Sequence, residues 1–184
     1  MFSADQASVV RYVVKNPSIN VLVHGRAGVG KSFVRDTCIE ACTGTKTIVV
    51  GPTGLSIDTL PAKIEYKFTL SRFLCAKGST LGDVALLGQR LAVPTSVLQR
   101  SQIFIEEAGM LSAAEFTALH RALVRTLGVH KPFGGVRLVL FCDLLQLRPV
   151  NNKFFWETTA FYEMDPNLVM FELTVNHRIN DADP

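Results

Sequence analysis

The sequence lacks the features that mark secreted and membrane-spanning proteins. No apolar stretch in its 184 residues approaches the roughly 20 residues that a membrane-spanning helix needs. The amino terminus has neither the basic flank nor the apolar core of a secretory signal. We therefore expect an intracellular protein that is not secreted and has no membrane partner. The sequence leaves a nuclear, mitochondrial, viral or cytoplasmic origin open.

Cysteine is scarce, and its spacing indicates neither a zinc site nor a disulfide framework. The 4 cysteines are Cys38, Cys42, Cys75 and Cys142, and none of them forms a C-x-x-C pair. Cys38 and Cys42 lie one helical turn apart, so a shared metal is conceivable. Two buried thiols on an apolar helix face are the expected arrangement. A reducing compartment fits this usage.

The chain also has little excess charge of either sign. It carries 19 basic and 16 acidic residues, a net charge of +3, which permits nucleic-acid binding without arguing for it. Hydrophobic residues make up 48% and charged residues 19%, as in a folded globular domain. Because no internal repeat, low-complexity tract or linker interrupts the sequence, we expect a single domain.

Short apolar runs alternate along the chain with helix signals. The runs predict strands at residues 19–23, 47–50, 102–105, 136–141 and 169–173. Helices are predicted at residues 4–14, 31–42, 80–91, 113–127 and 154–162. Capping boxes at Ser3 with Gln6 and at Ser112 with Glu115 support two of these helices. The remainder of residues 54–100 is expected to form loops and short helices. This order predicts an α/β fold with a central, mostly parallel sheet flanked by helices.

A phosphate-binding loop is the strongest motif. The pattern G-x-x-x-x-G-K-[ST] follows the first predicted strand and opens a helix, and comprises Gly25, Arg26, Ala27, Gly28, Val29, Gly30, Lys31 and Ser32. Glycines let the backbone N–H groups face phosphate, and the helix adds the positive end of its dipole. We expect Lys31 to reach the terminal phosphates of a nucleotide and the Ser32 hydroxyl to bind magnesium.

Two acids, Glu106 and Glu107, follow the predicted strand at residues 102–105. In P-loop motors the first acid at this position holds magnesium, and the next positions and deprotonates the attacking water. We assign Glu106 to the metal and Glu107 to the water. Alone, the pair would be interpreted as two solvated acids, but the phosphate loop upstream favours the functional interpretation.

Two later polar residues are candidates for sensing the terminal phosphate. Gln146 follows the strand at residues 136–141, and Arg178 follows the last predicted strand. A glutamine at such a strand end can report a phosphate, or it can simply cap a turn. Arg178 could act as an arginine finger, although a lone arginine in such a place is more often solvated.

The order of these motifs resembles the PIF-one (petite integration frequency) family of superfamily 1 DNA helicases over nearly the whole chain. The phosphate loop is similar, as are the Gly51–Gly54 and Thr69–Phe73 segments, the run after Glu106, the stretch from Pro132 to Val150 and the stretch from Glu172 to Arg178. The resemblance implies that residues 1–184 form the first, N-terminal RecA-like ATPase domain of a helicase. A second RecA-like domain is expected to follow in the same polypeptide, so this chain alone should be weakly active.

The resemblance also implies the ligands and their contacts. Mg-ATP would be hydrolysed to drive 5′ to 3′ translocation on single-stranded DNA and duplex unwinding, in DNA repair and recombination. Gln6 looks like the residue that reads the adenine base, and Arg178 like the one that contacts the terminal phosphate. The residues implied to contact DNA are Thr53, Gly54, Thr69, Ser71 and Arg72. Phe68 or Phe73 could stack on a base, but core packing is the expected role of each.

Four positions depart from the family pattern, and other functions stay open. Glu106 stands where the family has Asp, Ser71 where it often has His, Cys142 where it has Gly and Arg148 where it has Pro. One alternative is a viral superfamily 1 RNA helicase, and another is a nucleotide-binding module with little turnover. A small-molecule kinase would need a cluster of basic lid residues, which the sequence lacks.

Overall fold

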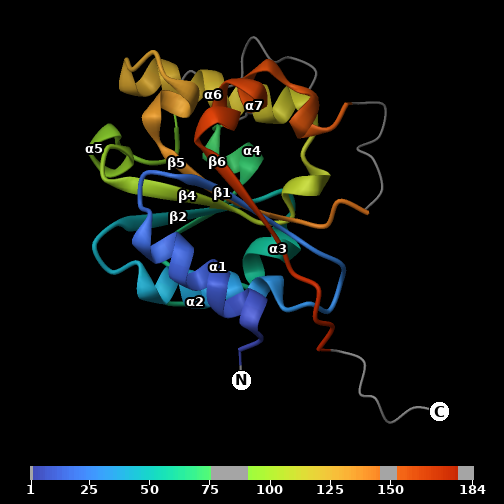
Figure 1. The fold of residues 1–184 in the computed structure, drawn as a ribbon. Coiled ribbons are helices and arrows are strands. Elements are labelled where there is room, and N and C mark those ends of the chain that lie inside the picture. Colours follow the sequence, from blue (N-terminus) through green and yellow to red (C-terminus); the bar gives the residue numbers. More distant parts are fainter. Residues whose placement is uncertain (1, 76–90, 146–152, 178–184) are drawn as a thin grey trace, which may run out of the picture.

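The computed structural model describes residues 2–75, 91–145 and 153–177, and within them six strands form one sheet (Figure 1). The strand order is β3-β2-β4-β5-β1-β6, and every neighbouring pair is parallel. The strands are β1 Asn20–His24, β2 Lys46–Gly51, β3 Tyr66–Thr69, β4 Ser101–Ile105, β5 Arg137–Cys142 and β6 Leu168–Glu172. The predicted parallel α/β architecture is therefore confirmed.

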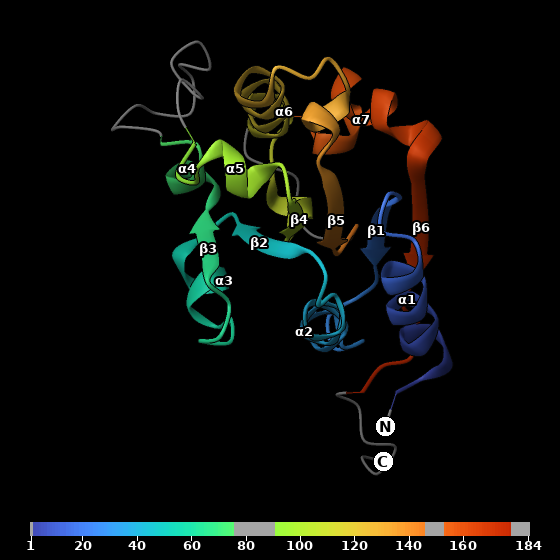
Figure 2. The same ribbon diagram turned by 90° about the vertical axis from the view of Figure 1, so that its left-hand side faces the viewer.

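Helices cover both faces of this sheet, as Figures 1 and 2 show. One face carries α1 Ala4–Lys15, α2 Lys31–Ala41 and α3 Gly54–Asp58. The other carries α4 Leu70–Phe73, α5 Thr95–Leu98, α6 Ala113–Leu127 and α7 Thr159–Met164. Four short 3-10 turns complete the described elements: η1 Ala108–Met110, η2 Pro132–Gly135, η3 Phe155–Glu157 and η4 Asp165–Asn167.

Alternation along the strands divides the apolar residues between two cores. In β1, Val21 and Val23 pack with the layer of α1 and α2, whereas Leu22 packs with the layer of α6. All three side chains are almost completely buried. A parallel sheet covered on both faces needs strands that are apolar throughout, which explains why these strands appear in the sequence as continuous apolar runs.

The capping predictions are confirmed at one helix and half confirmed at the other. At α6, Glu115 N–H donates to Ser112 Oγ (3.2 Å), and Ser112 N–H donates to the Glu115 carboxylate (2.8 Å). At α1, Gln6 Oε1 accepts from Ser3 N–H at 3.1 Å as predicted. The Ser3 hydroxyl, however, donates to the carboxylate of Asp5 rather than accepting from the helix.

Several predicted elements differ from the observed ones. The prediction of only loops and short helices between residues 54 and 79 is wrong, because Tyr66–Thr69 forms the edge strand β3 beside β2. This strand is only four residues long and all four are half-buried, so its short alternation of aromatic and polar residues was not recognised as a strand. The helix predicted at 154–162 is divided by the cap residue Thr158 into η3 and α7. The helix predicted at 80–91 falls almost entirely outside the described residues.

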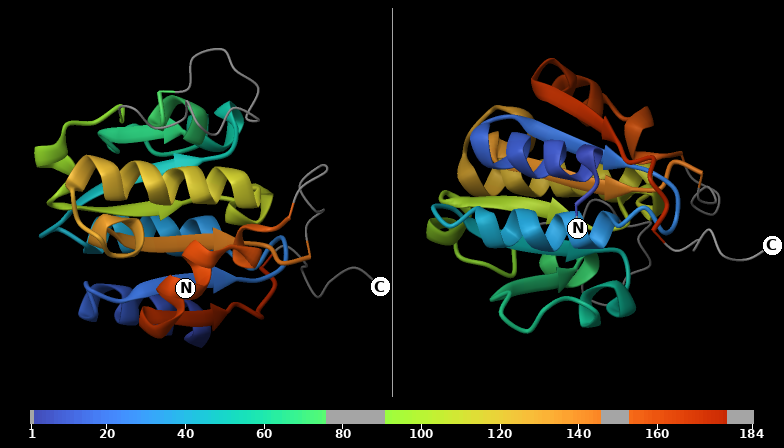
Figure 3. Two further views of the ribbon diagram at one scale, coloured as in Figure 1. Left: turned by 90° about the horizontal axis from the view of Figure 1, so that it is seen from above. Right: turned by 60° about the horizontal axis from the view of Figure 1, so that its bottom comes forward.

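Parallel pairing places the carboxyl ends of all six described strands on one edge of the sheet. Figure 3 shows the loop between β1 and α2 emerging at that edge. Ligands of open α/β sheets bind in the crevice outside this edge, so it is where the site should lie. In the described parts of the chain, every helix is too short or too polar to cross a bilayer.

Candidate nucleotide-binding site

The predicted phosphate loop links the end of β1 to the start of α2. Gly28 and Gly30 have φ values of +91° and +80°, in the left-handed region that glycine adopts without strain. Val29 between them is buried and anchors the loop to the core below α2. A Cβ atom on Gly30 would lie 2.5 Å from the Gln6 amide nitrogen. The loop therefore needs glycine at Gly30 both for its conformation and for its packing.

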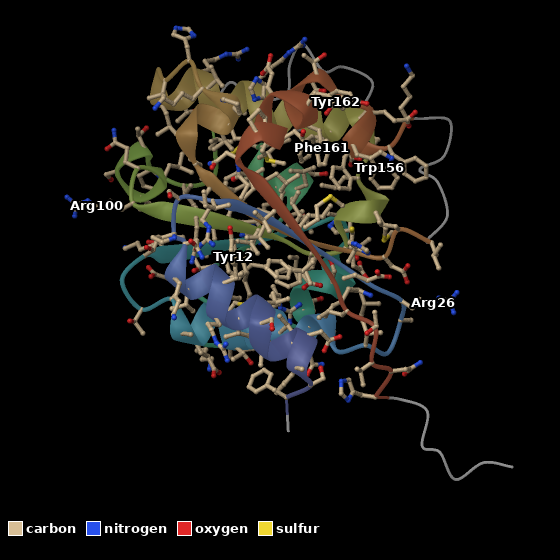
Figure 4. All side chains as sticks on the ribbon, viewed as in Figure 1. Tyr12, Arg26, Arg100, Trp156, Phe161 and Tyr162 are labelled. Carbon is tan, nitrogen blue, oxygen red and sulfur yellow. The ribbon has the colours of Figure 1, made fainter. Side chains whose placement is uncertain are left out.

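Lys31 and Ser32 begin α2 directly behind the loop. The Lys31 ammonium donates to the carbonyl oxygens of Gly25 (2.6 Å) and Arg26 (2.9 Å), which holds it over the loop. Ser32 is exposed in the first turn of the helix. The Arg26 side chain points away from the loop into solvent in Figure 4, so only its backbone takes part in the loop.

The two predicted acids adopt different conformations at the end of β4. Glu106 continues the strand, since its N–H donates to Val50 O at 2.8 Å, and its side chain is buried. Glu107 turns the chain sharply, with φ +46° and ψ +40°, and is half-buried. A non-glycine residue in this left-handed region costs of order 1–3 kcal/mol, and such strain clusters at functional sites.

The phosphate loop, the two acids and the end of β5 line a single cleft of about 410 Å³. Its walls are Ala27, Gly28, Gly30, Lys31, Ser32, Glu106, Glu107, Phe141, Cys142 and Asp143. The structure therefore brings the predicted residues Lys31, Ser32, Glu106 and Glu107 together. One cation, Lys31, and three acidic residues, Glu106, Glu107 and Asp143, thus share one cleft, which suits a phosphate group and a divalent metal ion.

Burial controls the charge of the groups along the cleft. Burial raises the pKa of Glu106, Arg35 opposes that rise, and the neighbouring carboxylate of Glu107 adds to it. Burial likewise raises the pKa of the Cys142 thiol to about 12, so this side chain is neutral at physiological pH. Cys142 therefore lines the cleft with a small, uncharged side chain. Its backbone oxygen accepts a hydrogen bond from Gly25 N–H at 3.3 Å.

Gln6 reaches the loop from α1. Its amide nitrogen donates to Val29 O at 3.0 Å and lies 3.0 Å from His177 Nε2, and the residue is buried. His177 N–H in turn donates to Gly28 O at 3.0 Å, so the chain after β6 returns across the phosphate loop. This return brings the chain to the loop just before Arg178. Gln146 and Arg178 themselves lie outside the described residues.

The residues predicted to contact DNA gather at the carboxyl ends of β2 and β3. Thr53 Oγ1 accepts from Ser56 N–H and caps α3, and Thr69 Oγ1 accepts from Arg72 N–H and caps α4. Gly54, Ser71 and Arg72 are exposed there. Phe73 is fully buried, which confirms its expected role in the core, and Phe68 packs against it at a centroid distance of 5.9 Å.

Sequence reasoning assigned no role to two charged residues of the site, Asp143, which lines the cleft, and Arg35. Arg35 lies on α2, and its Nη1 is 2.7 Å from Glu106 Oε1, with both side chains buried. The contact is an ion pair between two buried charges. The sequence does contain a signal for Arg35, because it is a charged residue next to Val34 and one turn from Cys38 on an apolar helix face, but it contains none for the partner of Arg35.

The cleft offers oxygen ligands for magnesium. Ser32, Glu106, Glu107 and Asp143 all line it. Among the described residues, however, no group of three or more His, Cys, Asp or Glu side chains could bind a metal on its own. Magnesium commonly uses one or two carboxylates together with substrate phosphates, so these residues fit an ion that arrives with a nucleotide.

The family is decided by a match across the chain: a family model described as PIF1-like helicase covers residues 1–183. The chain belongs to the PIF1-like helicase family. The human ATP-dependent DNA helicase PIF1 is 30% identical over 177 residues, which cover 94% of this chain and 26% of that protein. The PIF7 helicase of Trypanosoma brucei brucei is 33% identical over 176 residues, covering 93% of this chain and 18% of that protein. The chain therefore spans about a quarter of the human relative.

Solved Pif1 structures share the fold of this family member. A Bacteroides Pif1 in complex with ADP-AlF4 superposes with a TM-score of 0.76 and 23% identity, covering 98% of this chain and 43% of that one. Pif1 from Candida albicans gives a TM-score of 0.74 with 20% identity, covering 95% and 40%. These likenesses confirm the RecA-like α/β fold predicted for the chain.

Proposed function

We propose that this chain is the ATP-binding motor domain of an ATP-dependent DNA helicase. The observation that carries the proposal is the single cleft that holds the phosphate loop and the acidic pair, in a chain of the PIF1-like family. The human and trypanosomal relatives are themselves described as ATP-dependent DNA helicases. A viral RNA helicase is not favoured, because the PIF1-like match extends over residues 1–183.

Each residue of the cleft has a role in this proposal. The loop N–H groups and Lys31 bind the phosphates, and Lys31 exchanges its bonds to Gly25 and Arg26 for phosphate oxygens. Ser32 and Glu106 hold magnesium, which neutralises phosphate charge when bound. Glu107 orients the attacking water and accepts its proton. Gln146 and Arg178 are proposed to contact the terminal phosphate, and Gln6 the adenine base.

Single-stranded DNA is the proposed track. Thr53, Gly54, Thr69, Ser71 and Arg72 share the sheet edge that carries the cleft, so motion at the phosphates can be transmitted to the strand. A Bacteroides Pif1 of the same fold is described as bound to single-stranded DNA. We propose 5′ to 3′ movement and a second RecA-like domain that completes the motor.

Nucleotide binding provides the first test. Titration with a fluorescent ATP analogue and magnesium should show saturable binding to the 184-residue chain. Lys31→Ala should weaken binding at least tenfold, because one charge-assisted hydrogen bond contributes about 1.5–3 kcal/mol. Lys15→Ala, at an exposed lysine at the end of α1, is the matched control and should bind like the wild type.

Turnover separates a motor from a binding module. Steady-state ATP hydrolysis should be slow for this chain, should rise with single-stranded DNA more than with RNA, and should disappear in Glu107→Gln. Tight binding without any hydrolysis, with or without DNA, would instead identify a nucleotide-binding module. Stimulation by RNA alone would contradict the DNA assignment.

A further inference from the structure

The ion pair between Arg35 and Glu106 joins the helix of the phosphate loop to the acidic end of β4. Both side chains are almost fully buried, with exposed fractions of 4% for Arg35 and 9% for Glu106. The two residues are distant in sequence, and neither belongs to a motif that predicts the other. Buried charges of this kind are retained only where they are paired, so the contact fixes where both groups can lie.

Arg35 is itself held in one orientation by its neighbour. Its Nε and Nη2 atoms both lie 2.8 Å from Asp36 Oδ1, and its Nη1 lies 2.7 Å from Glu106 Oε1. The planar guanidinium is therefore fixed between two carboxylates. A lysine has a single charged nitrogen and cannot reproduce this fork.

The ion pair with Arg35 involves only the Oε1 atom of Glu106, and the Glu106 residue still lines the cleft. Oε1 is closed off from solvent beside Arg35, yet Glu106 still lines the cleft together with Lys31 and Ser32. The contact thus fixes the direction in which the remaining oxygen can face.

We propose that Arg35 is a positioning residue of the nucleotide site, which fixes Glu106 so that its free oxygen serves the magnesium that accompanies ATP. This inference rests on the proposed nucleotide-binding function and deepens it. Groups that orient a metal ligand typically change metal affinity by about 10–100-fold when they are removed. Arg35 should therefore control the magnesium dependence of ATP binding more strongly than ATP binding itself.

The test measures the affinity of the 184-residue chain for a fluorescent ATP analogue in EDTA and across a series of free magnesium concentrations. In Arg35→Met, the gain in affinity on adding magnesium should fall by about tenfold relative to the wild type. The affinity in EDTA should stay close to that of the wild type, because the metal that Glu106 would hold is then absent. Arg100→Met is the matched control, since Arg100 lies at the other end of β4 and points into solvent in Figure 4.

Two further variants separate positioning from folding. Arg35→Lys keeps a buried charge but not the fork, so it should lose less magnesium dependence than Arg35→Met but more than the wild type. This partial loss is the test if Arg35→Met does not fold. In a Glu106→Gln background, Arg35→Met should cause no additional loss of magnesium dependence, because the group that it positions is gone. Circular dichroism and thermal unfolding verify that each variant is folded.

The outcomes distinguish this inference from the proposed function. Equal losses of affinity in EDTA and in magnesium would show that Arg35 only supports the fold. An unchanged magnesium dependence in Arg35→Met would also overturn the inference, while leaving the nucleotide-binding function intact. Failure of the wild-type chain to bind ATP under any condition would refute the proposed function itself.

Discussion

Among the residues of the cleft, Gly30 is confined both by its backbone conformation and by its neighbour. Its φ of +80° places it in the left-handed region, and an added Cβ atom would meet the Gln6 amide nitrogen at 2.5 Å. That amide also donates to Val29 O, so it cannot move without losing a buried hydrogen bond. The conformation of the loop and the position of the proposed base-reading residue are therefore coupled at this glycine.

Gly30→Ala should lower the free energy of unfolding by about 1–2 kcal/mol from left-handed strain alone, and further through the clash with Gln6. It should also weaken ATP binding. Gly128→Ala, at φ +66° in open space, should show the strain without the clash. Gly44→Ala, with open space and no positive φ, should be close to neutral. Urea unfolding and nucleotide titration compare the three variants. A loss of stability in Gly30→Ala no larger than that in Gly128→Ala would contradict the role of Gln6.

At the scale of elements, the start of α1 is tied to the segment that leaves β6. Asp5 Oδ2 accepts from Thr174 N–H at 2.9 Å, and this contact holds together two segments from opposite ends of the described chain. Partial burial alone would raise the pKa of Asp5. Hydrogen bonds from the Ser3 hydroxyl and from the Thr174, Gln6 and Val175 N–H groups lower it to about 2 instead. The folded state thus favours the ionised carboxylate.

Because this pKa lies below the ordinary value of 3.8, the stabilisation from Asp5 is complete above about pH 4 and is lost as the pH falls through about 2. Asp5→Asn should therefore melt below the wild type at pH 5, and the gap between their Tm values should shrink toward pH 2. Thermal unfolding at several pH values provides the measurement. A gap that stays constant over this range would contradict the stabilising role of the Asp5 charge.

The layer of α6 and α7 depends on a cluster of aromatic rings. Phe116 of α6 is fully buried, and its ring lies 4.9 Å from Phe133 and 5.1 Å from Phe155 between centroids. Phe116→Ala should lower the free energy of unfolding by about 3–5 kcal/mol. The control is Tyr162→Ala in α7, whose side chain is 67% exposed and should contribute little. Urea denaturation of both variants measures the difference.

At the scale of the whole molecule, the net charge of +3 permits DNA binding without arguing for it, so the position of each charge matters. Arg72 is exposed at the sheet edge that carries the cleft, whereas Arg100 precedes β4 at the opposite edge. The proposed DNA track runs along the first of these edges. Of these two arginines, only Arg72 should therefore contribute to binding single-stranded DNA at that edge.

Arg72→Ala should weaken binding to single-stranded DNA. It should also reduce the slope of log affinity against log salt concentration by roughly 0.7, the value for one phosphate contact on a single strand. Arg100→Ala should leave both quantities unchanged. Fluorescence anisotropy with a labelled oligonucleotide at several salt concentrations measures these effects. An equal loss in the two variants would indicate binding through overall charge rather than along the proposed track.

The sequence by itself determined the features that depend on neighbours in the chain. The phosphate loop from Gly25 to Ser32, the capping box of Ser112 with Glu115 and five of the six described strands follow from local chemistry, because glycine conformations, helix caps and apolar runs act over a few residues. The order of these elements was sufficient to predict the parallel sheet. Parallel pairing then explains why Lys31 and Glu107 share one edge.

Only the tertiary structure decided which distant groups touch. The edge strand β3 has too short an alternating run to be recognised locally and is defined by its pairing with β2. The left-handed conformation of Glu107 has no glycine or other local signal in the sequence. The contact of Arg35 with Glu106 joins α2 to β4 and has no local signature. Such contacts arise when the helix layers close on the sheet, since a buried charged side chain is retained only where it is paired.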